Sequence, residues 1–454
     1  MTAYADKRTR LAASLAAARG DGATAFGLAK PTSNLFRDRA VRTAPRIDLS
    51  GFDSVLGVDP VAGTVDAEGM TTFVALADAT LQHGTMPRVV PQLKSITLGG
   101  AVAGVGIESS SFRCGLVHET IAAMDVLTGG GDIVTCTPDN EHRDLFFGLP
   151  NSYGTLGYTL RLTARTAPVK RYVAIEHRAF GDAAAFFAAM GDLLHDPSID
   201  FLDGVAFGGD DLVVTAARFV DAAPWTSDYT YERIYYRSLR ERDCDYLTAH
   251  DYLWRWDSDW FWCSKNVGAQ HPWLRRFYGR RRLNSVTYQK IMRLNSRVGL
   301  TRALSRLRGR SAESVIQDVD IPVEGAAAFL AFLLREVGVL PVWLCPIRAP
   351  RDATRAALYP IDPGRLYVNF GFWDVVERRG PAPEGAINRR IEREVERVGG
   401  LKSLYSSSYY DEATFWRIVD GAAYDALKRR YDPDGRLPGL YDKCVRARVR
   451  PAGS

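Results

Sequence analysis

Short apolar runs separated by glycine and aspartate dominate the first third of the chain. They predict strands over residues 47–52, 54–59 and 63–69, because short apolar runs bounded by turn-forming residues are typical of strands. Apolar positions at helical spacing predict helices over 8–19 and over about 72–83. The pattern therefore predicts a mixed domain at the N-terminal side.

A β-hairpin is predicted over residues 121–137. An apolar run leads into the turn Gly129–Asp132, and an alternating strand returns from it. The three glycines of this turn are therefore better explained by the hairpin than by a phosphate cradle. A second glycine-punctuated loop, at 151–157, leads into a strand that ends near Pro168.

The pattern changes after Lys170. A strand, an Ala- and Phe-rich helix over about 182–194 and two strands joined by Gly208–Asp211 predict an antiparallel sheet covered by a helix. The same strand–helix–strand–strand order returns after residue 314, with its helix at about 324–337. Two such units predict one α+β domain with a broad sheet.

The composition is ordinary for a globular enzyme, with 46% hydrophobic and 24% charged residues. A length of 454 residues exceeds the usual size of a single core, so two domains are expected. Six scattered cysteines without CxxC pairs argue against disulfides and structural zinc, and the seven histidines do not cluster, so no metal is expected. Residues 7–23 are interpreted as a first helix rather than a signal peptide, which favours a cytoplasmic location.

The stretch 97–115, TLGGAVAGVGIESSSFRCG, is rich in glycine and has three consecutive serines beside one acid, Glu108. A backbone with so few large side chains lets a large flat or phosphorylated ligand lie against main-chain N–H groups. Composition alone is equally compatible with a turn that lets two elements pack closely. Upstream, the loop 27–35 carries Lys, Thr, Ser and Asn donors that suit a phosphate.

Common nucleotide and hydrolase motifs are missing from the sequence. The dinucleotide motif GxGxxG is incomplete after Gly104 and Gly106, because Ser109 stands where the third glycine belongs. The sequence also contains no GxxxxGK[ST], HExxH or GxSxG. A Rossmann domain is therefore not expected.

Dense aromatics and a dense positive charge follow one another between the two sheet units. The aromatic positions are Trp254, Trp256, Trp260, Phe261 and Trp262. Between His271 and Arg310 there are twelve Lys or Arg and no Asp or Glu, although the whole chain has a net charge of only +5. This combination suits peripheral contact with an anionic membrane through 271–310. A tryptophan-rich core lid beside an exposed polar helix explains it equally well, and no nucleic-acid binding is expected.

Three blocks resemble the FAD-binding domain of the vanillyl-alcohol oxidase superfamily: GLAKPTSNLF, PRVVPQLKSITLGGAVAGVGIESSSFRCGL and VLTGGGDIVTCTPDNEHRDLFFGLPNSYGTLGYTLRL. Within that superfamily, GIESSS with the downstream CTP, DLF and GTLG resembles the 24-dehydrocholesterol reductase (sterol Δ24-reductase) family. Further matches are VIQDVDIPV, LPVWLCPI, LYVNFGFW and GGLKSLYSSSYYDEATFW, so the resemblance covers nearly the whole chain. The membrane-anchor helix of that family has no counterpart at this N-terminus, and the aromatic and basic insert is stronger than expected for the family.

The resemblance implies an α+β, two-domain fold of the vanillyl-alcohol oxidase type. The FAD-binding domain would span 1–170, and a substrate or cap domain with an antiparallel sheet would span 171–395. The cap domain would carry the insert at about 250–310, and the segment 396–454 would return to the flavin. In that last segment a strand is predicted to lead into a helix capped by Asp411.

The implied cofactor is non-covalent FAD. The stretches 27–35 and 97–110 would hold its pyrophosphate and ribityl chain, and Gly154–Gly157 would pass close to its adenine or isoalloxazine half. Covalent attachment is not expected, because Cys114 and His118 lie in no convincing attachment motif. The expected FAD-binding residues are Lys30, Pro31, Thr32, Ser33, Asn34, Leu35, Pro91, Thr97, Leu98, Gly99, Gly100, Ala103, Gly104, Gly106, Ile107, Glu108, Ser109, Ser110, Gly154, Thr155, Gly157 and Tyr158.

Flavin chemistry on an alkene needs a proton for one carbon besides the hydride for the other. The candidate proton donors or orienting groups are Tyr405, Tyr409, Asp318 and Glu108. Each also has a purely structural explanation. Glu108 would accept backbone N–H bonds beside the cofactor, Asp318 would be an exposed strand residue, and the two tyrosines would belong to the core.

The expected function is FAD-dependent reduction, or in reverse desaturation, of a C=C bond in a lipophilic sterol- or isoprenoid-like substrate. NADPH is the expected electron donor, and the expected location is the cytoplasm, in peripheral contact with the inner face of a membrane. One alternative is an FAD-dependent oxidase or dehydrogenase of an alcohol or a polyprenyl-linked sugar, although Ser406–Ser408 stand where such an enzyme needs a base. The other is a non-catalytic lipid-binding protein on the same fold.

Overall fold

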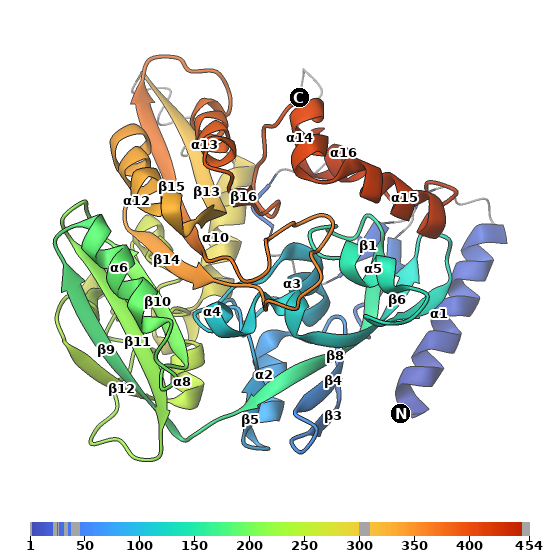
Figure 1. Cartoon of the computed structure of the whole chain (residues 1–454), viewed down its shortest axis with the longest axis horizontal. Coiled ribbons are helices and arrows are strands. Elements are labelled where there is room, and N and C mark those ends of the chain that lie inside the picture. Colours follow the sequence, from blue (N-terminus) through green and yellow to red (C-terminus); the bar gives the residue numbers. More distant parts are fainter. Residues whose placement is uncertain are drawn as a thin grey trace.

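The structure is a computed structural model that describes residues 2–20, 25, 27–30, 35–37, 46–298 and 309–446. Figure 1 shows two large β-sheets side by side, with helices on the outer face of the second sheet and a row of C-terminal helices lying across toward the first. The predicted α+β fold with an FAD-type domain and a cap domain is confirmed. The domain boundaries at 170 and 395 stay predictions.

The first sheet has the strand order β3–β4–β8–β6–β7, with β5 also paired to β8. Its strands are β3 (Val55–Asp59), β4 (Thr64–Glu68), β5 (Thr85–Pro87), β6 (Ile121–Thr128), β7 (Ile133–Cys136) and β8 (Gly157–Pro168). β6 and β7 form the predicted antiparallel hairpin, and Gly131 in its turn has a φ of 88°. That left-handed backbone favours glycine, so a turn accounts for this residue.

The strand predicted over 47–52 is shorter than expected and does not belong to the first sheet. It forms β2 (Arg46–Asp48), which pairs in parallel with β1 (Gly27–Ala29) outside the first sheet. The Asp48 side chain accepts a hydrogen bond from the Ser50 N–H at 2.8 Å, and this turn ends the strand.

The described part of the first domain contains the two predicted helices, over 8–19 and about 72–83, and four short ones that were not predicted. They are α1 (Thr2–Gly20), α2 (Phe73–Leu81), α3 (Leu98–Gly104), α4 (Ser111–Cys114), the 3-10 helix η1 (Val117–Thr120) and α5 (Arg143–Gly148). The Thr72 side chain caps α2 by accepting from the Ala75 N–H. Apolar residues of α2 and α3 pack against the first sheet in one core.

The second sheet has eight strands in the order β12–β9–β11–β10–β14–β15–β13–β16, and all its pairs are antiparallel. Its strands are β9 (Tyr172–Phe180), β10 (Phe201–Ala206), β11 (Leu212–Val220), β12 (Cys244–Thr248), β13 (Arg310–Pro322), β14 (Val342–Ile347), β15 (Tyr367–Arg379) and β16 (Leu401–Lys402). The two predicted units, β9–α6–β10–β11 and β13–α12–β14–β15, meet where β10 pairs with β14. The broad sheet expected from the repeated pattern is therefore present.

The two faces of this sheet are buried differently. Leu202, Ala206 and Val214 face the helices α6 (Ala183–Leu193), α12 (Val323–Phe332) and α13 (Ala386–Arg397), whereas their neighbours Phe201 and Val205 join the core of the first domain. Successive side chains of a strand point to opposite faces. One face therefore carries the helical layer, and the other is available for a site between the domains.

The insert between β11 and β13 folds over that second face. Its helices are α7 (Tyr235–Ser238), α8 (Ala249–Leu253), η2 (Cys263–Val267), α9 (Pro272–Tyr278), η3 (Arg280–Arg282) and α10 (Ser285–Val298). All five aromatic side chains at positions 254, 256 and 260–262 are buried. The membrane explanation is therefore wrong for these rings: Phe261 and Trp262 pack against Trp343 and Trp373 of the sheet, and Trp256 packs against Phe261 and Trp262.

Three helices close the chain: α14 (Glu412–Ile418), α15 (Gly421–Tyr431) and α16 (Leu440–Cys444). Asp411 caps α14 as predicted, by accepting from the Thr414 N–H at 2.9 Å. In Figure 1 α15 lies beside α5 of the first domain. In the described ranges, no helix has both the length and the apolar composition needed to cross a bilayer.

Candidate functional site

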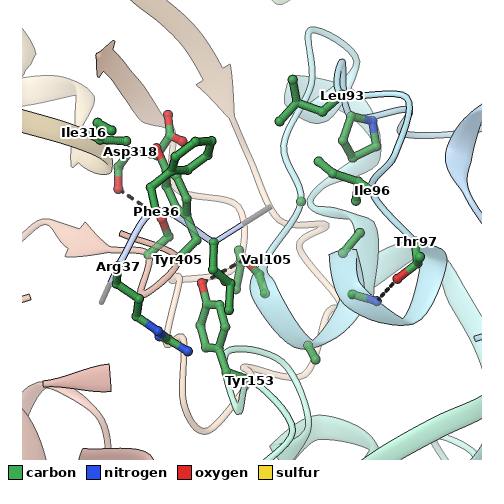
Figure 2. Close-up of a pocket in the computed structure, with 18 of the residues that line it drawn as sticks. Phe36, Arg37, Leu93, Ile96, Thr97, Val105, Tyr153, Ile316, Asp318 and Tyr405 are labelled. Atoms are coloured by element: carbon green, nitrogen blue, oxygen red, sulfur yellow. Dashed lines mark hydrogen bonds between the residues drawn. The ribbon is translucent and has the colours of Figure 1, made fainter. Parts of the chain in front are cut away.

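A cavity of about 500 Å³ lies between the two domains. Its walls come from α3 and the loops around it, from strands β13, β14 and β15, from the insert, and from the segment after β16. Figure 2 shows Asp318, Tyr405 and Phe36 gathered on one side, with Thr97, Ile96 and Leu93 on the other. The cavity therefore unites the N-terminal, central and C-terminal stretches that the sequence singled out.

The glycines around α3 permit close packing and also form a wall with few side chains, which are the two explanations that the sequence left open. A Cβ on Gly99 would lie 2.0 Å from the Thr159 Oγ1 atom, and one on Gly106 would lie 2.7 Å from the Val117 side chain, so these two glycines permit close packing. All four glycines at positions 99, 100, 104 and 106 also line the cavity. The stretch therefore lets two elements pack closely and also forms a cavity wall with few side chains.

A strained loop after β7 supports this wall. Asn151 and Tyr153 have φ angles of 62° and 49°, which non-glycine residues rarely adopt. The Tyr153 N–H donates to the Ala103 carbonyl at 3.0 Å, and its hydroxyl donates to the Gly104 carbonyl at 3.2 Å. The loop is thereby fixed to the end of α3.

Side chains at every second position of β13, together with Trp373, Asp374 and Val375 of β15, build the opposite wall. Ser314, Ile316 and Asp318 of β13 line the cavity, and Asp318 pairs in register with Gly371 of β15. A Cβ on Gly371 would lie 2.8 Å from the Asp318 Oδ1 atom and 2.5 Å from the Trp373 ring. Glycine at this position therefore leaves room for both side chains, and Asp318 is partly buried in the cavity wall rather than exposed on a strand.

Tyr405 is held in a chain of side-chain hydrogen bonds. The Trp373 Nε1–H donates to the Tyr405 hydroxyl oxygen at 2.9 Å, and the Tyr405 hydroxyl forms a hydrogen bond with the Asp318 carboxyl. Burial raises the pKa of Asp318 to about 7, against the opposing effect of the Tyr405 hydrogen bond. Burial also raises the pKa of Tyr405 well above its usual range. The pair can therefore hold a proton at neutral pH.

Glu108 belongs to a second buried cluster. Its Oε1 atom accepts from the Ser109 hydroxyl at 2.8 Å and from the Arg255 guanidinium at 3.2 Å. Arg255 also donates to Asp203 at 3.0 Å, as does Trp343 at 3.1 Å, and burial raises the pKa of Asp203 to about 6 although Arg255 opposes the shift. Glu108 is therefore bound to side chains of the cap domain, not to backbone N–H groups as one explanation expected.

The aromatic turn of the insert forms a further wall. Trp260, Phe261 and Trp262 have φ angles of 48°, 49° and 58°, three consecutive left-handed residues that are not glycine. The Asp259 carboxylate accepts a hydrogen bond from the Trp262 N–H inside this turn. Trp260 and Phe261 line the cavity, so the strain is stored where side chains meet the site.

Several buried polar atoms at the cavity have no partner among the described residues. They are both amide atoms of Gln92, the Glu108 Oε2 and the Asp318 Oδ1. Unpaired buried polar atoms are costly, so they point to a ligand that offers donors and acceptors. The polar edges of FAD supply such groups, and the residues present therefore fit the predicted cofactor.

Most predicted site residues reach this cavity. Those that line it are Lys30, Leu35, Pro91, Thr97, Gly99, Gly100, Ala103, Gly104, Gly106, Ile107, Glu108, Gly154, Gly157, Tyr158, Asp318 and Tyr405. Pro31, Thr32, Ser33 and Asn34 lie outside the described residues.

The structure does not bring the other predicted residues to the cavity wall. Leu98 is buried in the core, the Ser110 hydroxyl donates to the Arg88 carbonyl, and the Thr155 hydroxyl donates to the Ser152 carbonyl. Ser109 reaches only Glu108 and Arg255 in the second cluster.

Tyr409 is also absent from the lining and lies over Gly385 and Arg389 of the cap domain. Its backbone N–H donates to Glu392 at 2.8 Å, which turns this part of the chain away from Tyr405.

Sequence reasoning missed the aromatic lining. Phe36, Tyr153, Trp260, Phe261, Trp343 and Trp373 all face the cavity. The dense aromatic run of the insert was the available signal, but the sequence left a membrane surface and a tryptophan-rich core lid equally open, and the burial of the rings agrees with the core lid. Cys114 and His118 are not among the lining residues.

Comparison with known proteins agrees with this geometry. The FAD binding domain family matches residues 3–137. Delta(24)-sterol reductase of Arabidopsis thaliana is 25% identical over 441 residues, which cover 88% of this chain and 77% of the relative. The human Delta(24)-sterol reductase is 25% identical over 409 residues, which cover 87% of this chain and 76% of the relative.

A shorter match lies in one region only. Cytokinin dehydrogenase 6 of Oryza sativa subsp. japonica is 32% identical over 170 residues, which cover 37% of this chain and 32% of the relative. With an FAD-binding domain and a similarity to sterol reductases along most of its length, the protein is an FAD-dependent oxidoreductase similar to the Delta(24)-sterol reductases.

Proposed function

We propose that this protein reduces a C=C bond in a lipophilic, sterol- or isoprenoid-like substrate. The observation that carries the proposal is the partly buried Tyr405–Asp318 pair in the wall of an aromatic cavity, in a chain similar to Delta(24)-sterol reductases. When bound, FAD supplies a hydride through its N5 atom. The chain's own task is to bind and orient the substrate and to supply the proton.

The walls suit an apolar substrate. Trp260, Phe261, Trp343 and Trp373 surround the side of the cavity that carries Ile316 and Asp318. Aromatic rings bury large apolar areas and exclude water from a site. On the other side, Thr97, Gly100 and Gly104 would hold the cofactor along a bare backbone.

The proton would come from Tyr405. Its hydroxyl oxygen accepts from Trp373, which fixes the ring orientation, and its partner Asp318 is half protonated near pH 7. A protonated Asp318 can replace a proton that Tyr405 gives away. Reduction of an alkene needs such a donor, because one carbon receives the hydride and the other a proton.

NADPH is the proposed electron donor. The sequence has no second nucleotide motif, so the nicotinamide would enter the same cavity in turn with the substrate. We expect NADPH, added anaerobically to the purified holoenzyme, to bleach the flavin absorbance in a stopped-flow experiment. A saturated sterol should slow this bleaching by competition, and a flavin that stays oxidised would exclude NADPH as the donor.

The reduced enzyme distinguishes the possible acceptors. We expect an unsaturated sterol or polyprenol to reoxidise the flavin anaerobically faster than a quinone does, and faster than oxygen in a parallel aerobic run. The saturated product should appear in amounts equal to the flavin oxidised. A matched saturated sterol serves as the control, since it fills the cavity but accepts no hydride.

Oxidation of an alcohol or a polyprenyl-linked sugar is the second candidate. Asp318, with a pKa of about 7, would serve as the general base when deprotonated, and part of the chain resembles a cytokinin dehydrogenase. Reoxidation by quinone or oxygen, with no reaction of any alkene, would favour this candidate. The comparisons favour either enzyme over a non-catalytic lipid-binding protein.

A further inference from the structure

Helix α9 carries an apolar face that the protein leaves uncovered. Trp273, Leu274 and Phe277 are 79%, 47% and 81% exposed. Positions i, i+1 and i+4 of a helix share one side, so the three side chains form a continuous patch. Three of the seven large apolar side chains that are exposed in the described part of the chain lie here, which marks an interaction surface.

The opposite side of α9 is fixed to the protein. The buried Arg275 guanidinium donates to the Ala269 carbonyl at 3.2 Å, to the Ser258 hydroxyl at 3.2 Å and to the Tyr231 carbonyl. The Tyr278 hydroxyl donates to the Val267 carbonyl at 3.1 Å. The helix is therefore anchored with its apolar face outward.

Positive charge surrounds the patch. Arg276, Arg281 and Arg282 are exposed, and none of them forms an ion pair with a residue in the described ranges. Arg280 pairs with Asp228 at 2.8 Å, but both side chains are mostly exposed, so water screens this pair. No acidic residue occurs in the sequence between His271 and Arg310.

We propose that α9 docks the protein on a membrane surface that contains anionic lipids. The patch of Trp273, Leu274 and Phe277 would enter the headgroup region, and the free arginines would contact lipid phosphates. Tryptophan and arginine at this spacing match the two halves of a membrane interface, apolar below and anionic above. The membrane contact expected for 271–310 is thus confined to α9 and η3, while residues 299–308 lie outside the described ranges.

The docking face is connected to the cavity. α10 follows η3 directly, and its Met292 lines the cavity between the domains. A lipophilic substrate leaving the bilayer would therefore meet the element next to the site. The docking itself rests on α9 and η3 and stands whether or not the proposed reaction is correct.

Vesicle flotation with the full-length holoenzyme tests the proposal. We expect binding to phosphatidylcholine vesicles with phosphatidylglycerol, weak binding to pure phosphatidylcholine, and a strong loss on addition of salt. The variant W273S/F277S should lower the partition coefficient about tenfold or more. The variant R276Q/R281Q/R282Q should lower it on the order of a hundredfold at low salt, and only on anionic vesicles.

Two matched controls separate the patch from bulk properties. Val61 is 97% exposed in the turn between β3 and β4 of the first sheet, and V61S should bind vesicles like the wild type. The variant R165Q/R218Q/R429Q removes three exposed arginines elsewhere and should change the partition coefficient less than threefold by order of magnitude. Retained flavin absorbance and circular dichroism would establish that each variant is folded.

Three results would overturn the proposal. The first is equal binding of the wild type to neutral and anionic vesicles. The second is unchanged vesicle binding of both W273S/F277S and R276Q/R281Q/R282Q. The third is a wild-type dimer that W273S/F277S converts to a monomer without any vesicle binding, since the patch would then join two copies of the chain.

Discussion

Replacement of Tyr405 by Phe is expected to slow alkene reduction by a factor of about 10²–10⁴, while NADPH still bleaches the flavin. The substitution removes the hydroxyl that lies between the Trp373 Nε1–H and the Asp318 carboxyl, and it leaves the ring in place. Single-turnover reoxidation of the reduced enzyme by the alkene measures the step directly. Because bleaching needs no proton donor at this position, it reports that the variant is intact.

Tyr409 provides the control for this experiment. It lies only four residues further along, but it does not line the cavity, so Tyr409→Phe should reduce the alkene at nearly the wild-type rate. Equal losses in the two variants would mean that the segment acts through its packing. A Tyr405→Phe enzyme as fast as the wild type would remove Tyr405 from the mechanism.

The pH dependence of the same step identifies the proton source. Because burial raises the pKa of Asp318 to about 7, the carboxyl is protonated below that pH and ionised above it. Reduction should therefore proceed fastest below pH 7 and slow as the pH rises through about 7. Asp318→Asn should remove this transition, whereas a rate that increases above pH 7 would indicate a general base and support the alcohol-oxidising alternative.

Replacement of Arg255 by Met is expected to lower the free energy of unfolding by about 3–5 kcal/mol. The guanidinium is fully buried, bonds both Glu108 and Asp203, and lies 4.1 Å from the centre of the Tyr252 ring. Methionine keeps much of the volume but leaves two buried acids without their cation. Denaturant unfolding of the holoenzyme, followed by circular dichroism, measures the loss.

The pH dependence of this loss gives the matched control. Without Arg255 the two carboxyls avoid the cost of a buried charge only by taking up protons, so the variant should lose more stability at pH 8 than at pH 5. The double exchange Glu108→Gln with Asp203→Asn, combined with Arg255→Met, should recover part of the stability. A loss below about 1 kcal/mol at pH 8 would show that water already reaches the cluster.

The secondary structure was largely predictable because its signals are local. The turn at Gly129–Asp132, the cap at Thr72 and the cap at Asp411 each depend on residues a few positions apart. The alternation of cavity-lining and buried side chains along β13 likewise lies within a single strand. These features need no knowledge of distant contacts.

The insert was not predictable in the same way. A run of tryptophans beside arginines has the same local pattern in a core lid and at a membrane surface. The outcome depends on Trp343 and Trp373, which come from strands 80 or more residues further along the chain and cover the rings. Of the large apolar side chains described in the insert, Trp273, Leu274 and Phe277 of α9 stay exposed, together with Trp225 and Val286.

The sequence by itself was sufficient for the type of fold, the cofactor class and most of the glycine-rich wall, because these depend on short motifs with fixed spacing. It could not tell Tyr405 from Tyr409, or a structural Glu108 from one that faces a ligand. Those distinctions arise where β13, the insert and the C-terminal segment meet, and there burial and long-range hydrogen bonds set the proton affinity of Asp318 and bind Glu108 to Arg255. Such contacts join residues about 90 to 150 positions apart, which local patterns do not encode.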